Sequence, residues 1–204
     1  MPRRPALTTA TAALCALTAL TACQGSPEAG RPNTTPTSAS AAPTAPPTAP
    51  STPTWTPQEQ AAINAARARY VVARAAIDTA LNNPPAASRE KLLQTGTGGK
   101  WLVRVLVDVQ FNADRGWYQS GKTGIENISV ASVKLRADEP EVHLNACLNT
   151  AKIGLYYQET RKPVPGIPAN GNRHKVRAQL VYTVAAGESK KKWYLMDETA
   201  LGSC

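Results

Sequence analysis

A low-complexity segment limits how much of this 204-residue chain can fold. Residues 26–54 consist almost entirely of Pro, Thr, Ala and Ser, with no aromatic residue and no aliphatic side chain larger than that of Ala. Such a segment cannot bury enough apolar surface to offset the conformational entropy that folding removes. We therefore expect residues 23–54 to form a disordered tether, and residues 55–204 to form a single domain around one hydrophobic core.

The first 22 residues have the pattern of a secretory signal peptide. Arg3 and Arg4 give a short positive start, and residues 6–22 form an uncharged run made mostly of Ala, Leu and Thr. Five residues of this run are threonine, and the run is short for a membrane-spanning helix. A signal peptide is therefore the better interpretation.

Leu20-Thr21-Ala22-Cys23 resembles the bacterial lipobox, which has an aliphatic residue and two small residues before a cysteine. The small side chains fit the cleft of a signal peptidase, and the cysteine thiol accepts diacylglycerol. We expect Cys23 to become a lipidated N-terminus that holds the chain at the extracytoplasmic face of the cell membrane, since acyl chains contribute about 0.8 kcal/mol per buried CH₂. The alternative is an ordinary secreted protein in which Cys23 occurs by chance.

Two of the four cysteines remain for the domain, because Cys15 lies in the leader and Cys23 would carry lipid. An exported chain enters an oxidising compartment, where paired cysteines persist as disulfides. We therefore expect a disulfide between Cys147 and Cys204.

The formal net charge of +9 indicates anionic partners. We expect contact with the membrane through the lipid anchor, and consider an anionic wall polymer or an envelope protein as further partners; nucleic acid is not expected outside the cell. Basic residues cluster at three places late in the chain, at residues 161–162, 173–177 and 190–192. The last cluster follows a hairpin turn, where a solvated loop is the default interpretation and an anionic contact surface is the alternative. The candidate anionic contacts are Arg173, Lys175, Arg177, Lys190, Lys191 and Lys192.

The start of the domain predicts a long amphipathic helix. Thr56 has the position of an N-cap, with Pro57 in the first turn and Glu59 completing a capping box. Apolar residues then recur at helical spacing for about 25 residues, as far as Leu81, whereas Arg67, Arg69, Arg74 and Asp78 lie off that stripe. A short helix around residues 88–94 and a glycine-rich break follow.

The remainder predicts an antiparallel meander, which gives an α+β fold class. Strands are expected at residues 125–137, 141–150, 176–184 and 192–198, with a long proline-containing loop after the second. Residues 101–112 are ambiguous, because their apolar residues alternate like a strand and also form a helical face.

Several segments resemble a family of actinobacterial secreted lipoproteins whose domains are similar to the cone-shaped nuclear-transport-factor-two-like fold of ketosteroid isomerases and polyketide cyclases. The resemblance covers roughly Pro57 to Cys204. It implies N-terminal helices packed on a curved antiparallel sheet, with residues 101–112 as the third helix. The segments that carry it are residues 115–121, 128–133, 142–149 and 193–196, with the terminal Cys204.

Residues 116–123 match the phosphate-loop pattern GxxxxGK[ST]. That loop binds phosphate only where a helix N-terminus follows it, and here a β-branched run follows. We therefore expect a turn between Gly116 and Thr123 rather than a nucleotide site, and no cofactor. His143 and His174 are the two histidines of the chain, too few for a multi-histidine metal site.

No catalytic constellation stands out, so we expect a non-catalytic binding or protein-interaction domain. An isomerase-like enzyme is the alternative. Such an enzyme would need a carboxylate base and a tyrosine or protonated acid as oxyanion donor. An accessory subunit of an envelope secretion or conjugation machine is a third hypothesis. The groups available for isomerase-like chemistry are Asp108, Asp138, Asp197, Tyr156 and Tyr157.

Overall fold

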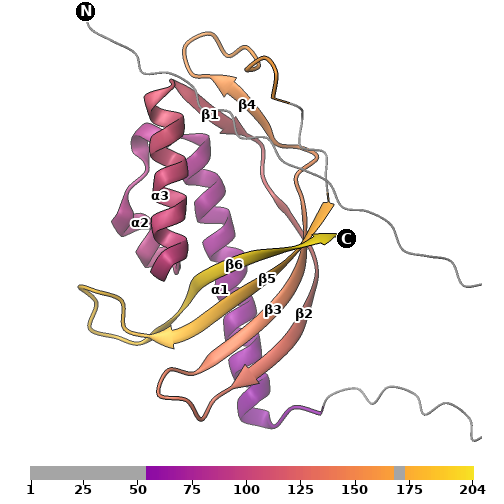
Figure 1. The fold of residues 1–204 in the computed structure, drawn as a ribbon. Coiled ribbons are helices and arrows are strands. Elements are labelled where there is room, and N and C mark those ends of the chain that lie inside the picture. Colours follow the sequence, from indigo (N-terminus) through magenta and orange to yellow (C-terminus); the bar gives the residue numbers. More distant parts are fainter. Residues whose placement is uncertain (1–53, 168–172) are drawn as a thin grey trace, which may run out of the picture. The chain divides into compact units, whose positions relative to one another are not determined.

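Figure 1 shows the fold of the chain in a computed structural model, which describes residues 54–167 and 173–204. The predicted leader, Cys23 and the tether as far as Pro53 lie outside the described residues. In the described part, three α-helices precede six strands, and the strands form two antiparallel sheets. The predicted α+β class is therefore confirmed.

Helix α1 (Pro57–Asn82) begins at the predicted capping box. The Thr56 side chain accepts a hydrogen bond from the Glu59 backbone N–H, and the Glu59 carboxylate accepts one of 2.9 Å from the Thr56 N–H. These two bonds satisfy backbone donors that a helix start leaves unpaired. The helix ends ahead of the 3₁₀ turn η1 (Pro84–Ala86), because a proline ring disfavours helical backbone in the residue before it.

Helices α2 (Arg89–Thr95) and α3 (Gly99–Asp114) follow. Ser88 caps α2, and Gly96 ends it in the left-handed conformation with φ +97°. The third helix that the family resemblance implied is confirmed. Its alternating apolar residues divide between two faces, because two residues along a helix correspond to a turn of about 200°. Trp101, Val105 and Val109 point to the core side, and Val103, Val107 and Phe111 are exposed.

The larger sheet has the strand order β2-β3-β5-β6, with every neighbouring pair antiparallel. Shifts of register within β2 and along the β5–β6 pair add local twist. The predicted strands are confirmed to within a few residues, except that β6 runs further than Glu198. The bounds are β2 (Gly124–Lys134), β3 (Glu141–Asn149), β5 (Arg173–Thr183) and β6 (Lys192–Ser203).

A second sheet pairs β1 (Trp117–Ser120) with β4 (Gly154–Tyr157). The sequence predicts a turn for the first segment and a long loop for the second, which is wrong for both. Aromatic pairs across the two strands explain the difference, since Trp117 lies opposite Tyr157 and Tyr118 lies opposite Tyr156.

The core joins the helices to one face of the larger sheet. Val142, Leu144, Ala146 and Leu148 alternate along β3 and are all buried. The chain between α2 and α3 also pairs with the edge of β6, where the Gly98 N–H donates to the Leu195 carbonyl at 2.9 Å. This contact fixes the start of α3 against the sheet.

The predicted disulfide between Cys147 and Cys204 is confirmed, with a Cα–Cα distance of 6.0 Å. Cys147 lies on β3, and Cys204 follows β6 and donates its backbone N–H to the Arg173 carbonyl. The bond therefore links the two neighbours of β5. Among the described helices, none combines the length and the apolar character needed to cross a membrane.

Candidate functional site

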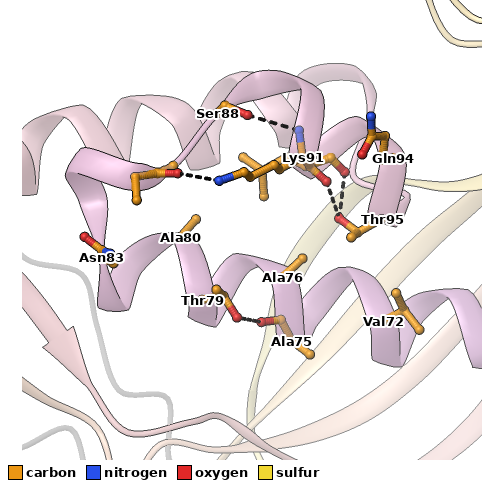
Figure 2. A pocket seen from close by; sticks show the side chains of 13 residues that line it. Val72, Ala75, Ala76, Thr79, Ala80, Asn83, Ser88, Lys91, Gln94 and Thr95 are labelled. Carbon is orange, nitrogen blue, oxygen red and sulfur yellow. Dashed lines mark hydrogen bonds between the residues drawn. The ribbon is translucent and has the colours of Figure 1, made fainter.

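A groove of about 490 Å³ lies between α1 and the η1–α2 segment (Figure 2). Small side chains of α1 form its floor, because residues spaced by three or four share one helix face. Leu92 closes the other side, and Lys91, Ser88 and Thr95 lie at its border. The α1 residues that line the groove are Val72, Ala75, Ala76, Thr79, Ala80 and Asn83.

The wall opposite α1 is held in place by hydrogen bonds. Lys91 Nζ donates to the Ala86 carbonyl at 3.2 Å, and the Lys91 N–H donates to the Ser88 hydroxyl. Thr95 Oγ1 donates back to the Lys91 carbonyl at 2.9 Å. The result is a mainly apolar groove with one ammonium group at its border, and its volume is within the range of small-molecule sites.

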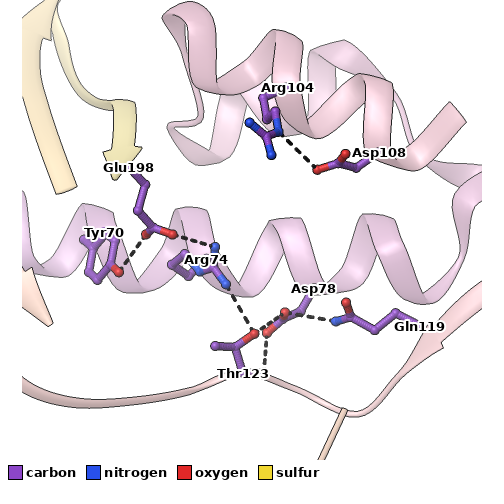
Figure 3. A network of polar contacts seen from close by, with 8 residues as sticks. All are labelled: Tyr70, Arg74, Asp78, Arg104, Asp108, Gln119, Thr123 and Glu198. Carbon is purple, nitrogen blue, oxygen red and sulfur yellow. Dashed lines mark hydrogen bonds and ion pairs between the residues drawn. The ribbon is translucent and has the colours of Figure 1, made fainter. Parts of the chain in front are cut away.

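A second candidate is a network of polar side chains between α1, β6 and the turn before β2 (Figure 3). Tyr70, Arg74 and Asp78 lie on one face of α1, because each is four residues from the next. The Tyr70 hydroxyl donates to Glu198 at 2.8 Å, and an Arg74 nitrogen lies 3.1 Å from the other Glu198 carboxylate oxygen. Arg74 also donates to the Thr123 hydroxyl at 3.3 Å.

Asp78 holds the turn into β2. Its carboxylate accepts the Thr123 backbone N–H at 2.9 Å, the Thr123 hydroxyl at 2.8 Å and the Gln119 amide at 3.3 Å. Its side chain is almost fully buried. A buried carboxylate needs such donors, since burial without them is strongly unfavourable. Asp78 therefore ties α1 to both ends of the β1–β2 connection.

The polar groups of Tyr70 and Glu198 are engaged in contacts within the protein. The side chains of Arg74 and Glu198 are 12% and 5% exposed, and Tyr70 is fully buried. Burial, followed by the charge of Glu198, raises the pKa of Tyr70 far above its ordinary value. Each Glu198 carboxylate oxygen already accepts a hydrogen bond from the protein, from Tyr70 or from Arg74. A ligand group that approached Glu198 would therefore compete with one of these two donors.

The sequence pattern does not predict this network. It places Arg74 and Asp78 off the apolar stripe of α1, which is wrong, since both side chains face the protein interior. The spacing of four between Tyr70, Arg74 and Asp78 was a signal. Their partners, Thr123 and Glu198, were not identifiable, because they come from distant parts of the sequence.

The groups considered for isomerase-like chemistry do not come together. Asp108 is exposed on α3, 4.0 Å from Arg104, and partial burial raises its pKa. Asp138 is exposed between β2 and β3. Asp197 pairs with Lys100 at 2.9 Å. Tyr156 and Tyr157 belong to β4 and pack against the aromatic rings of β1.

The two candidate basic groups lie at opposite ends of the β5–β6 hairpin. Arg173, at the start of β5, pairs with Glu126, and Arg177 donates to Asn145 at 3.2 Å. Lys175 lies between them on the same exposed face of β5. Lys192 lies opposite Thr183, at the far end of β5, and pairs with Glu188 at 2.9 Å. Exposed Lys190 and Lys191 precede it, so the six residues do not form one surface.

The phosphate-loop pattern between Gly116 and Thr123 contains β1 and leads into β2, a strand, so no helix N-terminus follows it. The Thr123 N–H is taken by Asp78. Elsewhere in residues 54–167 and 173–204, no three His, Cys, Asp or Glu side chains are grouped to hold a metal ion.

No protein-family model matches the chain, and no curated protein matches it. Among solved structures, the chain is similar to the intermembrane space region of the chloroplast protein ARC6, with 17% identity and a TM-score of 0.45. The similarity covers 74% of this chain and all of the ARC6 region. It is too weak to carry a function from one protein to the other.

Proposed function

We propose that this chain is an extracytoplasmic lipoprotein, anchored through acyl groups on Cys23, whose domain binds a ligand without catalysis. The disulfide between Cys147 and Cys204 is the observation that carries the location, because such bonds persist in oxidising compartments and are rare in the cytosol. The leader and the lipobox-like Leu20–Cys23 segment agree with it. The spacer after Cys23 would connect the domain to its anchored end.

The fold assignment within this proposal is the cone-shaped nuclear-transport-factor-two-like domain of secreted lipoproteins. Three helices before a bulged four-stranded sheet support it. In an isomerase of this class the inner sheet face must leave room for substrate. Here Leu144, Ala178 and Leu180 on that face are fully buried in the core, which favours a binding domain over an enzyme.

The groove between α1 and α2 is the binding site in this proposal. Its alanine, valine and leucine side chains match an apolar ligand body, and Lys91 at the border complements an anionic group. The ligand class is therefore a small amphipathic molecule with one acidic group.

Mass spectrometry of the native protein tests the anchoring. We expect a mature chain that begins at Cys23, carries the mass of acyl groups and lacks two hydrogens for the disulfide. A Cys23→Ser variant should lose the acyl mass and leave the membrane fraction. Full-length protein in the cytosol with its leader intact and both late thiols reduced would contradict the proposal.

Filling the groove tests the ligand site. Anilinonaphthalene sulfonate, an apolar anion, should bind the protein, and Ala76→Leu should weaken this binding by occupying the groove. Ala65→Leu, an exposed position on α1 outside the groove, is the matched control and should bind the dye normally. Urea midpoints of both variants would report folding separately. Unchanged dye binding in folded Ala76→Leu protein would exclude the groove.

A further inference from the structure

The outward face of α3 exposes three large apolar side chains in a row. Val103, Val107 and Phe111 are 56%, 59% and 47% exposed. Their spacing of four residues places them on one side of the helix, and we call this row the α3 stripe. The opposite side of α3 packs in the core, so the fold is complete without the α3 stripe.

The α3 stripe is unusual for a helix face in contact with water. Charged or polar residues normally occupy the outward face of an amphipathic helix. Val103 and Val107 are β-branched, so they also lower helix propensity relative to Lys or Glu at the same positions. Contiguous exposed apolar side chains of this kind mark contact surfaces.

Cations and aromatic rings surround the α3 stripe. The side chains of Lys100 and Arg104 are largely exposed beside it. At the C-terminal end of the helix, the Arg115 guanidinium lies 3.6 Å from the centre of the Phe111 ring. The Trp117 ring meets Phe111 edge to face, with centroids 6.1 Å apart.

This combination matches the headgroup region of an anionic bilayer. Aromatic side chains with one polar edge, and cations on long apolar stems, are stabilised at membrane interfaces. Anionic lipids attract cations near the surface. The formal net charge is +9 for the whole chain and 9 − 2 = +7 once the leader with Arg3 and Arg4 is removed, and it acts in the same direction. Asp108 and Asp114 also lie on this part of α3, and Asp108 is within 4.0 Å of Arg104.

The size of the α3 stripe argues against a stable protein interface. Such interfaces use roughly 20–30 residues from each partner. Three exposed apolar residues are far fewer, so a second copy of the chain would gain little from this face. A bilayer contact can be this small, because an anchored chain is already held at high local concentration near the lipid.

We propose that the α3 stripe, with Arg104, Arg115 and Trp117, seats on the headgroup region of an anionic lipid bilayer. The proposal rests on the proposed anchor at Cys23. The 32 residues from Cys23 to Thr54 span at most about 110 Å when fully extended. Helix α1 has 26 residues and a length of about 39 Å, so the tether is long enough for α3 to reach the lipid.

The test uses acylated protein reconstituted into phosphatidylcholine vesicles, with or without phosphatidylglycerol. A Val107→Cys variant offers one free thiol for an environment-sensitive fluorophore, because the two domain cysteines are bonded to each other. Val71→Cys, a similarly exposed valine on α1, is the matched control. We expect a blue shift and quenching by headgroup spin labels at position 107 with phosphatidylglycerol, and neither at position 71.

Two changes should remove the shift. Arg104→Glu combined with Arg115→Glu reverses the local charge. Raising the salt from about 0.1 M to about 1 M shortens the Debye length from about 10 Å to about 3 Å. If Cys23 proves unacylated, the anchor proposal fails separately. The labelled protein, with Cys23→Ser to keep one free thiol and an N-terminal histidine tag bound to nickel-chelating lipid, then still tests the α3 contact.

Two results would overturn the proposal. An unshifted probe on phosphatidylglycerol vesicles, with the acyl mass present, would exclude the α3 contact while leaving the anchor intact. A shift that grows with protein density and ignores phosphatidylglycerol would assign the α3 stripe to a second copy of the chain.

Discussion

The Tyr70 hydroxyl donates a 2.8 Å hydrogen bond to the Glu198 carboxylate, joining the middle of α1 to β6 across 128 residues of sequence. The Glu198 side chain is 5% exposed, and Arg74 is its other partner. Because the three side chains are buried together, removing one leaves at least one of the other two short of a hydrogen-bonding partner.

Tyr70→Phe should lower the free energy of unfolding by about 1.5–3 kcal/mol, the range for a hydrogen bond to a charged group. Urea denaturation measures the change. Tyr182→Phe is the matched control, because Tyr182 is partly exposed and its ring contact with Trp193 survives the substitution. An equal effect of the two variants would contradict a special role for the Tyr70 hydroxyl.

The buried Tyr70 hydroxyl should make the folded protein less stable in alkaline solution. Burial, with the charge of Glu198, raises the folded pKa of Tyr70 above its ordinary value of 10.0. Above pH 10.0, Tyr70 in the unfolded chain releases its proton, whereas Tyr70 in the folded protein keeps it. Stability is therefore fully present below pH 10 and should fall by about 1.4 kcal/mol per pH unit above it.

Urea midpoints of the native chain and of Tyr70→Phe between pH 9 and pH 11 check this effect. The native chain should lose stability more steeply than the variant over that window. Parallel curves would mean that Tyr70 ionises as easily in the folded protein as in the unfolded chain.

Asp78→Asn should destabilise the connection between β1 and β2. The amide keeps one acceptor oxygen but presents a donor to Thr123 or Gln119, which already donate there. We expect a loss of about 2 kcal/mol in urea denaturation, because buried donors lose their acceptor. The exposed Asp138→Asn should stay within about 0.5 kcal/mol of the native value. Faster amide exchange at Thr123 would locate the damage.

Removing the disulfide should cost about 4 kcal/mol, since the bond closes a separation of 57 residues. A double Cys147→Ser, Cys204→Ser variant should show this loss in its urea midpoint. Reductant should destabilise the native chain to the same extent and leave the double variant unchanged. A double variant as stable as the native chain would show that other contacts hold the end of β6.

Local sequence signals predicted the elements that depend on local chemistry. The Thr56–Glu59 capping box predicted the start of α1, and the strand expected at residues 141–150 matches β3 to within one residue. Residues 101–112 were different, because alternate apolar residues fit a strand and a helix equally well. The family resemblance, not the pattern, gave the correct helix.

The features that sequence reasoning missed depend on distant partners. Strands β1 and β4 have four residues each, and each is stable only because the other lies beside it. Arg74 and Asp78 looked like solvated residues, since nothing near them in sequence indicated Thr123 or Glu198. The groove has no motif of its own, because alanines on a helix predict packing as readily as a cavity.

The separation of the two sheets has a consequence for how the molecule opens. In the described residues β1 and β4 pair with each other and not with β2, β3, β5 or β6. Side-chain and turn contacts, such as those from Asp78 and from Asn82 to the Gly121 carbonyl, connect them to the body. We therefore expect this β1–β4 ribbon to open as a unit, with its amides exchanging while the four-stranded sheet stays folded.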